Sequence, residues 1–354
     1  MQYMKRKTIS SADPSIFDYQ NWVDKMATNA TALDRLLAIV NFERFRGDLE
    51  RPLLCEARGP GGRPAFDAVL MFKVLVLQRM YNLSDDQAEY QIRDRFSFQR
   101  FLGLTVADAM PDAKTIWKYR EIWTNAGAVE ACFILFRNEL AKQGLVENPG
   151  KIVDATFVDV PKQRNSREEN KHIKENGTAP GEWSQQPAKM RQKDVDARWT
   201  KKNDEKHYGY KCHTLVSSMS KLIEGYLVTG AHVHDSQVFM ELLDPDRDDA
   251  VFADSAYRSR AFEALLAEMG IESKVCRKGS RGHKLSDEDK AWNRLASAIR
   301  CRVEHVFGMM TTMMDAMRIR CIGIARATGI IGLNNLVYNM LRSEQIFRLK
   351  LRCA

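Results

Sequence analysis

The order of strands and helices in the second half of the chain is the feature that most restricts its fold. An apolar strand is predicted at 152–158, and two β-rich runs of alternating polarity follow at 207–217 and 222–229. The four residues between those two runs favour a hairpin. The remaining predicted elements are, in chain order, a short helix (235–243), a strand (250–254), a helix (260–269), a strand (271–276) and a long helix after 286. This order requires a mixed α/β sheet covered by helices.

Three acidic residues fall on separate elements of that pattern. Asp154 belongs to the first apolar run, Asp254 ends the run at 250–254, and Glu304 lies on the long helix. Side chains at the ends of buried parallel strands emerge where α/β sheets place their ligands. The order of elements matches the ribonuclease-H-like fold, in which acids on the first and fourth strands and on a later helix form the active centre. Asp154, Asp254 and Glu304 are therefore the candidate catalytic residues.

The helix that carries Glu304 is predicted from its pattern of apolar side chains. These are spaced by three or four positions, as one face of a helix requires, and they are Trp292, Leu295, Ile299, Val303, Val306 and Met310. Arg300 precedes Glu304 by four residues, so both side chains project from one face. Arg300 would orient the carboxylate, grip a phosphate or form an ordinary surface ion pair, and the sequence leaves these interpretations open.

Carboxylates of this kind suit a magnesium site, because Mg²⁺ is a hard cation that prefers oxygen ligands. Two Mg²⁺ ions about 3.5–4 Å apart can activate an attacking oxygen and stabilise a leaving oxygen in phosphodiester chemistry. We expect Asp154 to bridge both ions, Asp254 and Glu304 to hold one each, and Mn²⁺ to substitute for Mg²⁺.

Other acidic and histidine residues fit a metal site less well. Asp159 is five residues beyond the first candidate acid, so a continued strand would point it to the opposite face. The acidic stretch at 244–249 resembles a solvated turn. His232, His234 and Asp235 would need further zinc ligands at standard spacing, and the sequence shows none. His234 and Asp235 are expected to border the site or to cap a helix.

The first 148 residues are predicted to be helical. Residues 65–80 are apolar nearly all round, which indicates a buried helix. Ser84 with Gln87, and Asp112, favour the starts of two further helices. The second of these helices carries three basic side chains, Lys114, Lys118 and Arg120. A set of short helices whose last helix is basic resembles a helix-turn-helix unit. The alternative is a small helical bundle in which Trp117 and Tyr119 are core residues.

Charge adds a weaker pointer to a polyanionic partner. The net charge is +8 and the pI is near 9.0. Residues 161–211 hold 13 Lys/Arg against 8 Asp/Glu, and 300–326 hold five arginines against two acids. Ordinary solvated surface would explain the same counts. The polar stretch at 161–206 fits no regular element and is long for a loop, which is typical of a functional or disordered segment.

The compartment is expected to be the cytoplasm. The seven cysteines are scattered and contain no C-x-x-C pair, which argues against a disulfide framework and a thiolate zinc site. The basic segment at 1–7 is followed by Ser, Asp and Pro in place of an apolar core, so no signal peptide is expected. No apolar stretch is long enough for a membrane span.

Several motifs resemble those of the bacterial DDE transposases of the insertion-sequence-five group. The resemblance covers most of the chain. The first catalytic block of that family is similar to 153–156, its second to 253–257, and its third, with an Arg-x-x-x-Glu core, to 300–307. The segments 81–85, 111–116, 207–213 and 234–235 also resemble family regions.

The resemblance implies Mg²⁺-dependent cutting of DNA at the ends of an insertion sequence and joining of the freed 3′-hydroxyls to target DNA. It also implies double-stranded DNA as partner, at terminal inverted repeats and target, and a homodimer or larger assembly in a bacterial, nucleoid-associated setting. The domains would be a helical DNA-binding or assembly domain at 1–148 and a catalytic domain at 149–354 with the basic insertion at 161–206. Candidate DNA contacts are Arg300, Arg302, Tyr257, Lys211, Lys114, Lys118 and Arg120.

Two positions depart from the family pattern. Relatives often carry Tyr three residues before the Arg and Lys seven residues after the Glu, and here these are Ser297 and Thr311. Since both family side chains assist DNA binding, the departures bear on phosphate contacts and leave the three acids untouched. Two alternatives stay open: an inactive DNA-binding regulator of element ends, and a ribonuclease-H-like nuclease without strand transfer.

Overall fold

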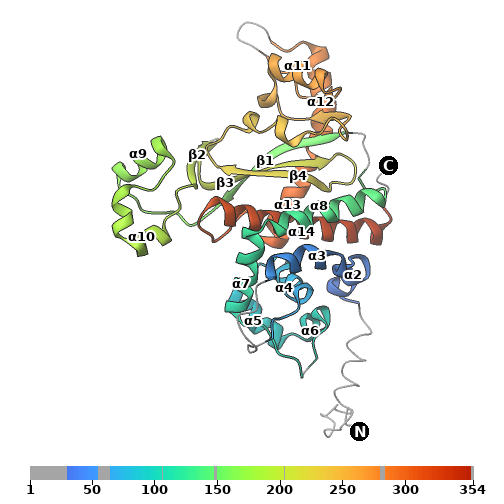
Figure 1. Ribbon diagram of the computed structural model, residues 1–354. Coiled ribbons are helices and arrows are strands. Elements are labelled where there is room, and N and C mark those ends of the chain that lie inside the picture. The colour runs from blue at the N-terminus through green and yellow to red at the C-terminus, as the bar shows by residue number, and fades with distance from the viewer. Residues whose placement is uncertain are drawn as a thin grey trace, which may run out of the picture.

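The computed structural model describes residues 30–54, 64–105, 107–146, 150–202, 204–279 and 284–351. It consists of a mixed sheet with helices above and below it, and a mainly helical N-terminal region beneath the lower helices (Figure 1). The basic segment at 1–7, Cys55 and Cys353 lie outside the described residues. The five described cysteines are free thiols. Among the described residues, no helix is long and apolar enough to span a membrane.

Six strands form one sheet in the described part of the chain. They are β1 (Lys151–Asp159), β2 (Arg198–Lys202), β3 (Glu205–Ser217), β4 (Ile223–Gly230), β5 (Ala250–Phe252) and β6 (Glu272–Ser273). β3 pairs antiparallel with β1, β2 and β4, whereas β5 pairs parallel with β1 and with β6. A meander of three antiparallel strands followed by two parallel strands is the ribonuclease-H-like arrangement, so this fold prediction is confirmed.

A glycine inside β3 allows that strand to approach the end of β1 closely. Gly209 has φ +150°, and a Cβ built there would lie 2.3 Å from the carbonyl oxygen of Val158. No other residue fits that space without displacing the backbone of β1. The predicted hairpin at 207–229 is confirmed as β3 and β4, whose register shifts between Leu215 and Val216.

The N-terminal region is helical, as predicted. Its helices are α2 (Ala32–Ile39), α3 (Arg46–Glu50), α4 (Ala68–Met80), α5 (Asp85–Asp94), α6 (Phe96–Leu102), α7 (Ala113–Asn125) and α8 (Ala128–Lys142). The capping box of Ser84 with Gln87 starts α5, and Asp112 caps α7. α4 is buried along most of its length, as its apolar sequence indicates.

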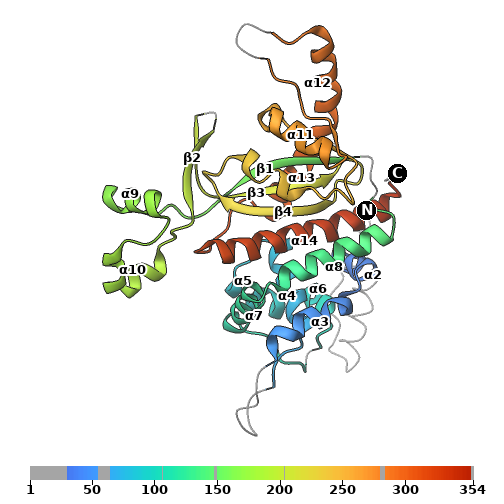
Figure 2. The same cartoon turned by 45° about the horizontal axis from the view of Figure 1, so that its top comes forward.

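The C-terminal helix α14 (Ile324–Leu349) joins the two halves of the molecule. It lies between the sheet and the N-terminal helices in both views (Figures 1 and 2) and packs most extensively on α8, β4 and α7. Asn339 accepts from the N–H of Ile223 (2.8 Å) and donates to the carbonyl of Ile223 (2.7 Å), which fixes the helix against β4. One hydrophobic cluster includes residues from both halves. The domain boundary near 148 marks a change of secondary structure and stays a prediction.

The polar stretch at 161–206 is more regular than predicted. It holds α9 (Arg167–Asn176), a 3₁₀ turn η3 (Gly181–Gln185), α10 (Pro187–Gln192) and β2. Ser166 and Glu169 form a capping box at the start of α9. Glu169 also accepts from the indole N–H of buried Trp183 at 2.8 Å and from Lys189 at 2.5 Å. The expectation of no regular element was wrong because these local caps outweigh the polar composition.

Three other element predictions needed correction. The long helix after 286 is two helices, α12 (Asp287–Arg300) and α13 (Arg302–Met314), separated at Cys301. The short helix at 235–243 is two 3₁₀ turns, η4 (Asp235–Gln237) and η5 (Met240–Leu242). The strand at 271–276 is only the two residues of β6, whereas the helix at 260–269 is confirmed as α11 (Arg260–Glu268).

Candidate active site

The first candidate acid lies in the middle of β1, the strand paired on both sides. The side chain of Asp154 is 21% exposed, so it opens to solvent from a mostly protein-lined position. Its Oδ1 accepts from the N–H of Ala155 at 2.8 Å, and its Oδ2 accepts from Nη1 of Arg300 at 3.1 Å. Burial raises the pKa of the Asp154 carboxyl, and the bond from Ala155 and the charge of Arg300 oppose that rise.

Arg300 links two of the three acids. It ends α12, and its Nη2 lies 3.7 Å from Oε1 of Glu304, in the first turn of α13. Its guanidinium therefore contacts Asp154 on the sheet and Glu304 on the helix at once. The Glu304 side chain is 66% exposed and accessible from outside. The alternative of a simple surface ion pair does not fit, because Arg300 reaches a strand residue 146 positions away.

Strand register brings the third acid to the same face of the sheet. β1 and β5 are parallel, and Ile152 pairs with Phe252. Asp154 and Asp254 each follow their paired residue by two positions, and Asp254 keeps an extended backbone. Since side chains two apart share a face and neighbouring strands lie about 4.8 Å apart, both carboxylates emerge on one face. Oδ1 of Asp254 accepts from the N–H of Ser255 at 2.6 Å.

Tyr257 follows Asp254 by three residues and carries a buried hydroxyl. Tyr257 is 3% exposed and packs on Phe239, with ring centroids 5.1 Å apart. Its hydroxyl has no hydrogen-bond partner among the described residues. Burial first, and then the charges of Asp235, Asp154 and Asp254, raise the pKa of Tyr257. The two candidate aspartates thus lie within electrostatic range of one unsatisfied polar group.

The residues present are chemically suited to a hard divalent cation. Two carboxylates already meet one cationic group, Arg300, and Asp254 faces the same side. Among the described residues, however, no group of three or more His, Cys, Asp or Glu side chains is drawn together closely enough to hold a metal. The zinc alternative at His232, His234 and Asp235 gains no support.

Comparison with known families decides the identity of the chain. A family model described as "Transposase DDE domain" matches residues 147–340, and one described as "Transposase domain (DUF772)" matches residues 21–121. The first match alone spans more than half of the 354 residues. The chain belongs to the DDE transposase family.

Among solved structures, this transposase is similar to a chain of the "piggyBac transposase synaptic complex with hairpin DNA". The similarity has 11% sequence identity and a TM-score of 0.44, over 93% of this chain and 78% of that chain.

Several predicted DNA contacts of the transposase are engaged within the protein. Lys211 donates to the carbonyl of Val233 (2.7 Å) and to Asp235 (2.8 Å), and its side chain is 11% exposed. Arg302 donates to the carbonyl of Ser218 at 2.5 Å in the turn after β3. Both residues therefore anchor neighbouring segments of the sheet, and Tyr257 is buried as described above.

The three cations predicted on α7 divide into two kinds. Lys114 and Lys118 are exposed, and Trp117 between them is 50% exposed. Arg120 instead forms two bonds of 2.7 Å to Asp85 on α5. Tyr119 is buried, so the core interpretation holds for Tyr119 and not for Trp117.

The two departures from the family pattern lie in different surroundings. Ser297 is partly buried, with its Oγ 3.6 Å from the sulfur of Cys276. Thr311 is exposed and donates to the carbonyl of Phe307 on its own helix at 2.8 Å. Asp235 is the residue whose role the sequence left least defined. The structure makes it the partner of Lys211 and a neighbour of Tyr257, whereas His234 caps η4.

Proposed function

We propose that this transposase, as a member of the insertion-sequence-five group, cuts DNA at the ends of its own element and joins the freed 3′-hydroxyls to target DNA. Asp154, Asp254 and Glu304 would be the ligands of two Mg²⁺ ions, for which Mn²⁺ would substitute. When bound, such ions activate an attacking oxygen and stabilise a leaving oxygen. The observation that carries the proposal is the shared sheet face of Asp154 and Asp254, with Arg300 linking Asp154 to Glu304.

The chain's own residues contribute positioning and charge. Arg300 holds the carboxylate of Asp154 in one orientation and keeps it beside Glu304. Its planar fork also suits a phosphate when the carboxylates are otherwise engaged. The pair of Lys211 with Asp235 fixes the turn after β4 that lies beside the site. Partners would be double-stranded DNA, at terminal inverted repeats and target, and further copies of the chain on paired ends.

The test is incubation of the purified protein with labelled duplexes that carry candidate terminal repeats, with Mg²⁺ and a target plasmid. Joined products support the proposal. Cleavage without joining would indicate a nuclease, and binding without cleavage would indicate a regulator of element ends.

The site is tested by Asp154→Asn, Asp254→Asn and Glu304→Gln, which remove charge with little change of volume. Each is expected to abolish cleavage while DNA binding is kept. The matched controls are Asp159→Asn, which is exposed at the far end of β1, and Glu288→Gln, which is exposed on α12. Near wild-type cleavage by a site variant would remove that residue from the proposed ligand set.

A further inference from the structure

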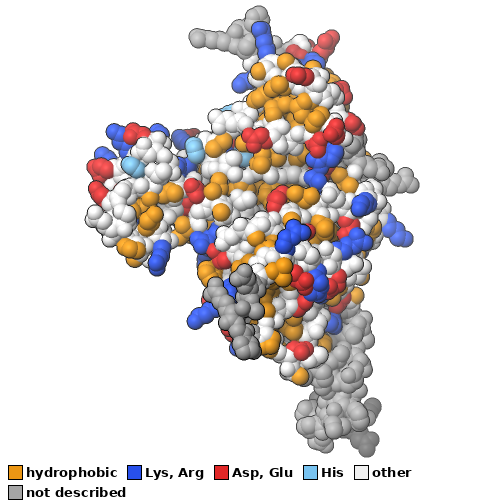
Figure 3. Space-filling view, viewed as in Figure 1, with side chains coloured by type: hydrophobic (Ala, Val, Ile, Leu, Met, Phe, Trp, Pro, Cys, Tyr) orange, Lys and Arg blue, Asp and Glu red, His pale blue; other side chains and the backbone are white. Residues whose placement is uncertain are grey.

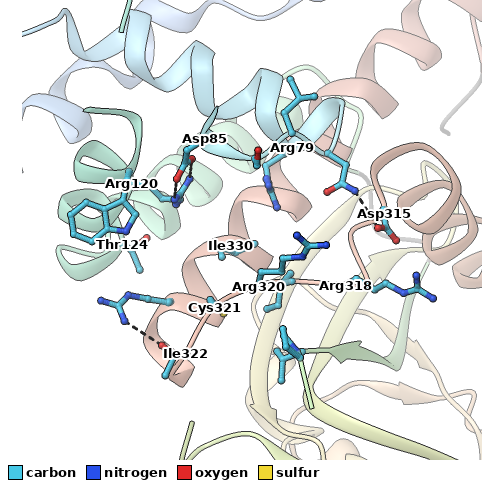
Figure 4. A pocket seen from close by; sticks show the side chains of 18 of the residues that line it. Arg79, Asp85, Arg120, Thr124, Asp315, Arg318, Arg320, Cys321, Ile322 and Ile330 are labelled. Carbon is cyan, nitrogen blue, oxygen red and sulfur yellow. Dashed lines mark hydrogen bonds and ion pairs between the residues drawn. The ribbon is translucent and has the colours of Figure 1, made fainter. Parts of the chain in front are cut away.

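A large cleft lies apart from the three acids. Its volume is about 1170 Å³, and three stretches of the chain form its walls: the helices α4, α5 and α7, the residues near 160–163 and 192–193, and the segment at 315–330 (Figure 4). None of the candidate catalytic acids lines it. The volume exceeds the range of about 300–1,000 Å³ typical of small-molecule pockets.

The cleft is rich in Lys and Arg side chains, and the acidic side chains in its lining already have partners. The positively charged lining residues are Arg79, Arg120, Lys162, Lys193, Arg318, Arg320 and Arg326. Of the three acids in the lining, Asp85 is held by Arg120, and Glu121 is held by Arg326 at 2.7 Å. Asp315 accepts from Asn82 at 3.1 Å. The cleft thus carries an excess of positive charge that its own carboxylates do not neutralise.

The side chains of three arginines face this space without a hydrogen bond or an ion pair in the described part of the chain: Arg79, Arg318 and Arg320. Asp85, which is already paired with Arg120, acts on Arg79 only through space, by raising its pKa. Arg318 and Arg320 are exposed, while Arg79 is recessed at the end of the buried helix α4. Figure 4 shows the Arg79 and Arg320 side chains extending from opposite walls into the same space. On the face drawn in Figure 3, by contrast, Lys and Arg side chains are interspersed with Asp and Glu.

Arg79 is costly to keep in this position. Burial, and then the charge of Arg120, lower the pKa of Arg79 to about 10, so it stays charged at neutral pH. A desolvated cation without a partner opposes folding. A ligand that supplies negative charge would remove that cost. Guanidinium groups bind phosphate oxygens through two parallel N–H bonds, which makes phosphate a well-matched ligand.

We propose that this cleft is a DNA-binding surface of the transposase, in which Arg79, Arg318 and Arg320 bind phosphates of the DNA backbone. The inference rests on the proposed function, which supplies DNA as the substrate. A single small anion would fill little of the cleft, whereas a nucleic-acid backbone presents phosphates to opposite walls. Trp117 lines the same cleft and is 50% exposed, so it offers an aromatic face on which a base can stack.

The experiment measures binding of a fluorescent duplex by anisotropy across a salt series. The cleft variant is the triple Arg79→Gln, Arg318→Gln, Arg320→Gln, with each single variant beside it. Each phosphate contact contributes about 0.9 to the slope of log K against log salt. The triple variant should lower that slope by about 2.7, which corresponds to about 500-fold weaker binding at 0.1 M salt. Each single variant should lower it by about 0.9, which corresponds to about 8-fold weaker binding.

The matched control removes three charges elsewhere: Arg51→Gln, Lys142→Gln, Lys350→Gln. None of these residues lines the cleft, and the Arg51 side chain is 79% exposed. Lys350 follows the C-terminus of α14, whereas the N-terminal turns of α14 line the cleft. A helix of 26 residues is about 39 Å long, so Lys350 lies far from it. The control should keep the wild-type slope.

Thermal melting separates a binding role from a structural one. Because the side chains of Arg79, Arg318 and Arg320 make no hydrogen bond or ion pair with another described residue, the cleft variants should melt at or above the wild-type temperature while binding DNA weakly. Lower melting temperatures for the cleft variants alone would indicate a structural role and overturn the inference.

The binding data also separate this inference from the proposed function. A wild-type protein that fails to bind any duplex at low salt would refute the proposed function itself. Wild-type binding that the cleft variants retain would refute the cleft alone. Tighter, cleft-dependent binding of an acidic polypeptide such as polyglutamate than of DNA would also overturn the cleft assignment.

Discussion

The buried ion pair at the start of β1 gives the sharpest prediction about stability. Lys151 is 0% exposed, and its Nζ lies 2.6 and 2.7 Å from the two carboxylate oxygens of Glu224 on β4. The pair is three residues from Asp154 and lies where β1 pairs with both β3 and β5. Replacing Lys151 with Met would leave Glu224 buried without its counter-ion.

The size of the effect follows from that burial. Removing one partner of a buried pair costs about 3–5 kcal/mol, because the other charge stays desolvated. At roughly 2–4 °C per kcal/mol for a domain of this size, the melting temperature should fall by roughly 10 °C. Replacing both partners, as in Lys151→Met with Glu224→Leu, should recover most of that loss, because Glu224 no longer leaves a buried carboxylate without its counter-ion. Burial raises the pKa of nearby Asp248, the charges of Lys151 and Arg247 oppose that rise, and the double variant keeps the charge of Arg247.

Acidity provides an independent check on the single variant. Burial raises the pKa of the Glu224 carboxyl, and the charge of Lys151 opposes that rise. Without Lys151 the folded state would hold a proton that the unfolded chain releases. The Lys151→Met variant should therefore become more stable as pH falls from about 7 toward 5, since the folded state then binds more protons.

Urea unfolding followed by circular dichroism at several pH values would measure these differences. A cost below about 1 kcal/mol for Lys151→Met, or a double variant no more stable than the worse single variant, would refute the reasoning. The Arg51→Gln variant, at an exposed position, should unfold like the wild type.

Three further predictions concern single contacts. Arg300→Lys keeps the charge, but a lysine cannot span two carboxylates, so the rate of DNA cleavage should fall about tenfold (~1.4 kcal/mol) with an unchanged melting temperature. An unchanged cleavage rate would show that the two-pronged guanidinium is not needed. Gly209→Ala would place a Cβ 2.3 Å from a β1 carbonyl, so the folded yield should drop sharply, and a wild-type melting curve would contradict the close approach. Hydrogen bonds, first from Lys189, lower the pKa of Glu169 to about 2, so the α9–α10 segment should loosen as pH falls from about 4 toward 2. The fluorescence difference between wild type and Trp183→Phe reports this, and Glu169→Gln should abolish the pH dependence.

Local patterns in the sequence predicted the elements that carry the acids. The apolar runs around Asp154 and Asp254 form neighbouring parallel strands. They were predictable because a short continuous apolar stretch is typical of a buried strand. The Arg-x-x-x-Glu spacing predicted a shared helix face for Arg300 and Glu304. That contact is present although the helix is interrupted at Cys301 between them. Arg300 and Glu304 stay one helical turn apart because the backbone of Cys301 departs little from helical geometry.

Contacts between segments that lie far apart in the chain could not be predicted from the sequence. Nothing local distinguishes a lysine that binds DNA from one that pairs with an aspartate 24 positions later, as Lys211 does with Asp235. Tyr257 follows a catalytic block, yet its ring packs on Phe239 in the core. Arg302 faces the turn after β3, which only the three-dimensional arrangement reveals.

The arginines of the cleft show how a binding site can be recognised where the sequence contains no motif for it. Arg120 is paired with Asp85, whereas Arg79 makes no ion pair with a described residue and has only the through-space charge of Asp85 to offset its burial. Arg79 instead follows a run of apolar residues at the end of α4 and opposes Arg320 from another part of the chain. Keeping like charges together opposes folding unless something outside the chain compensates. A cation in the last turn of a largely buried helix is therefore a local signal, and its meaning depends on which distant charges the fold brings opposite it.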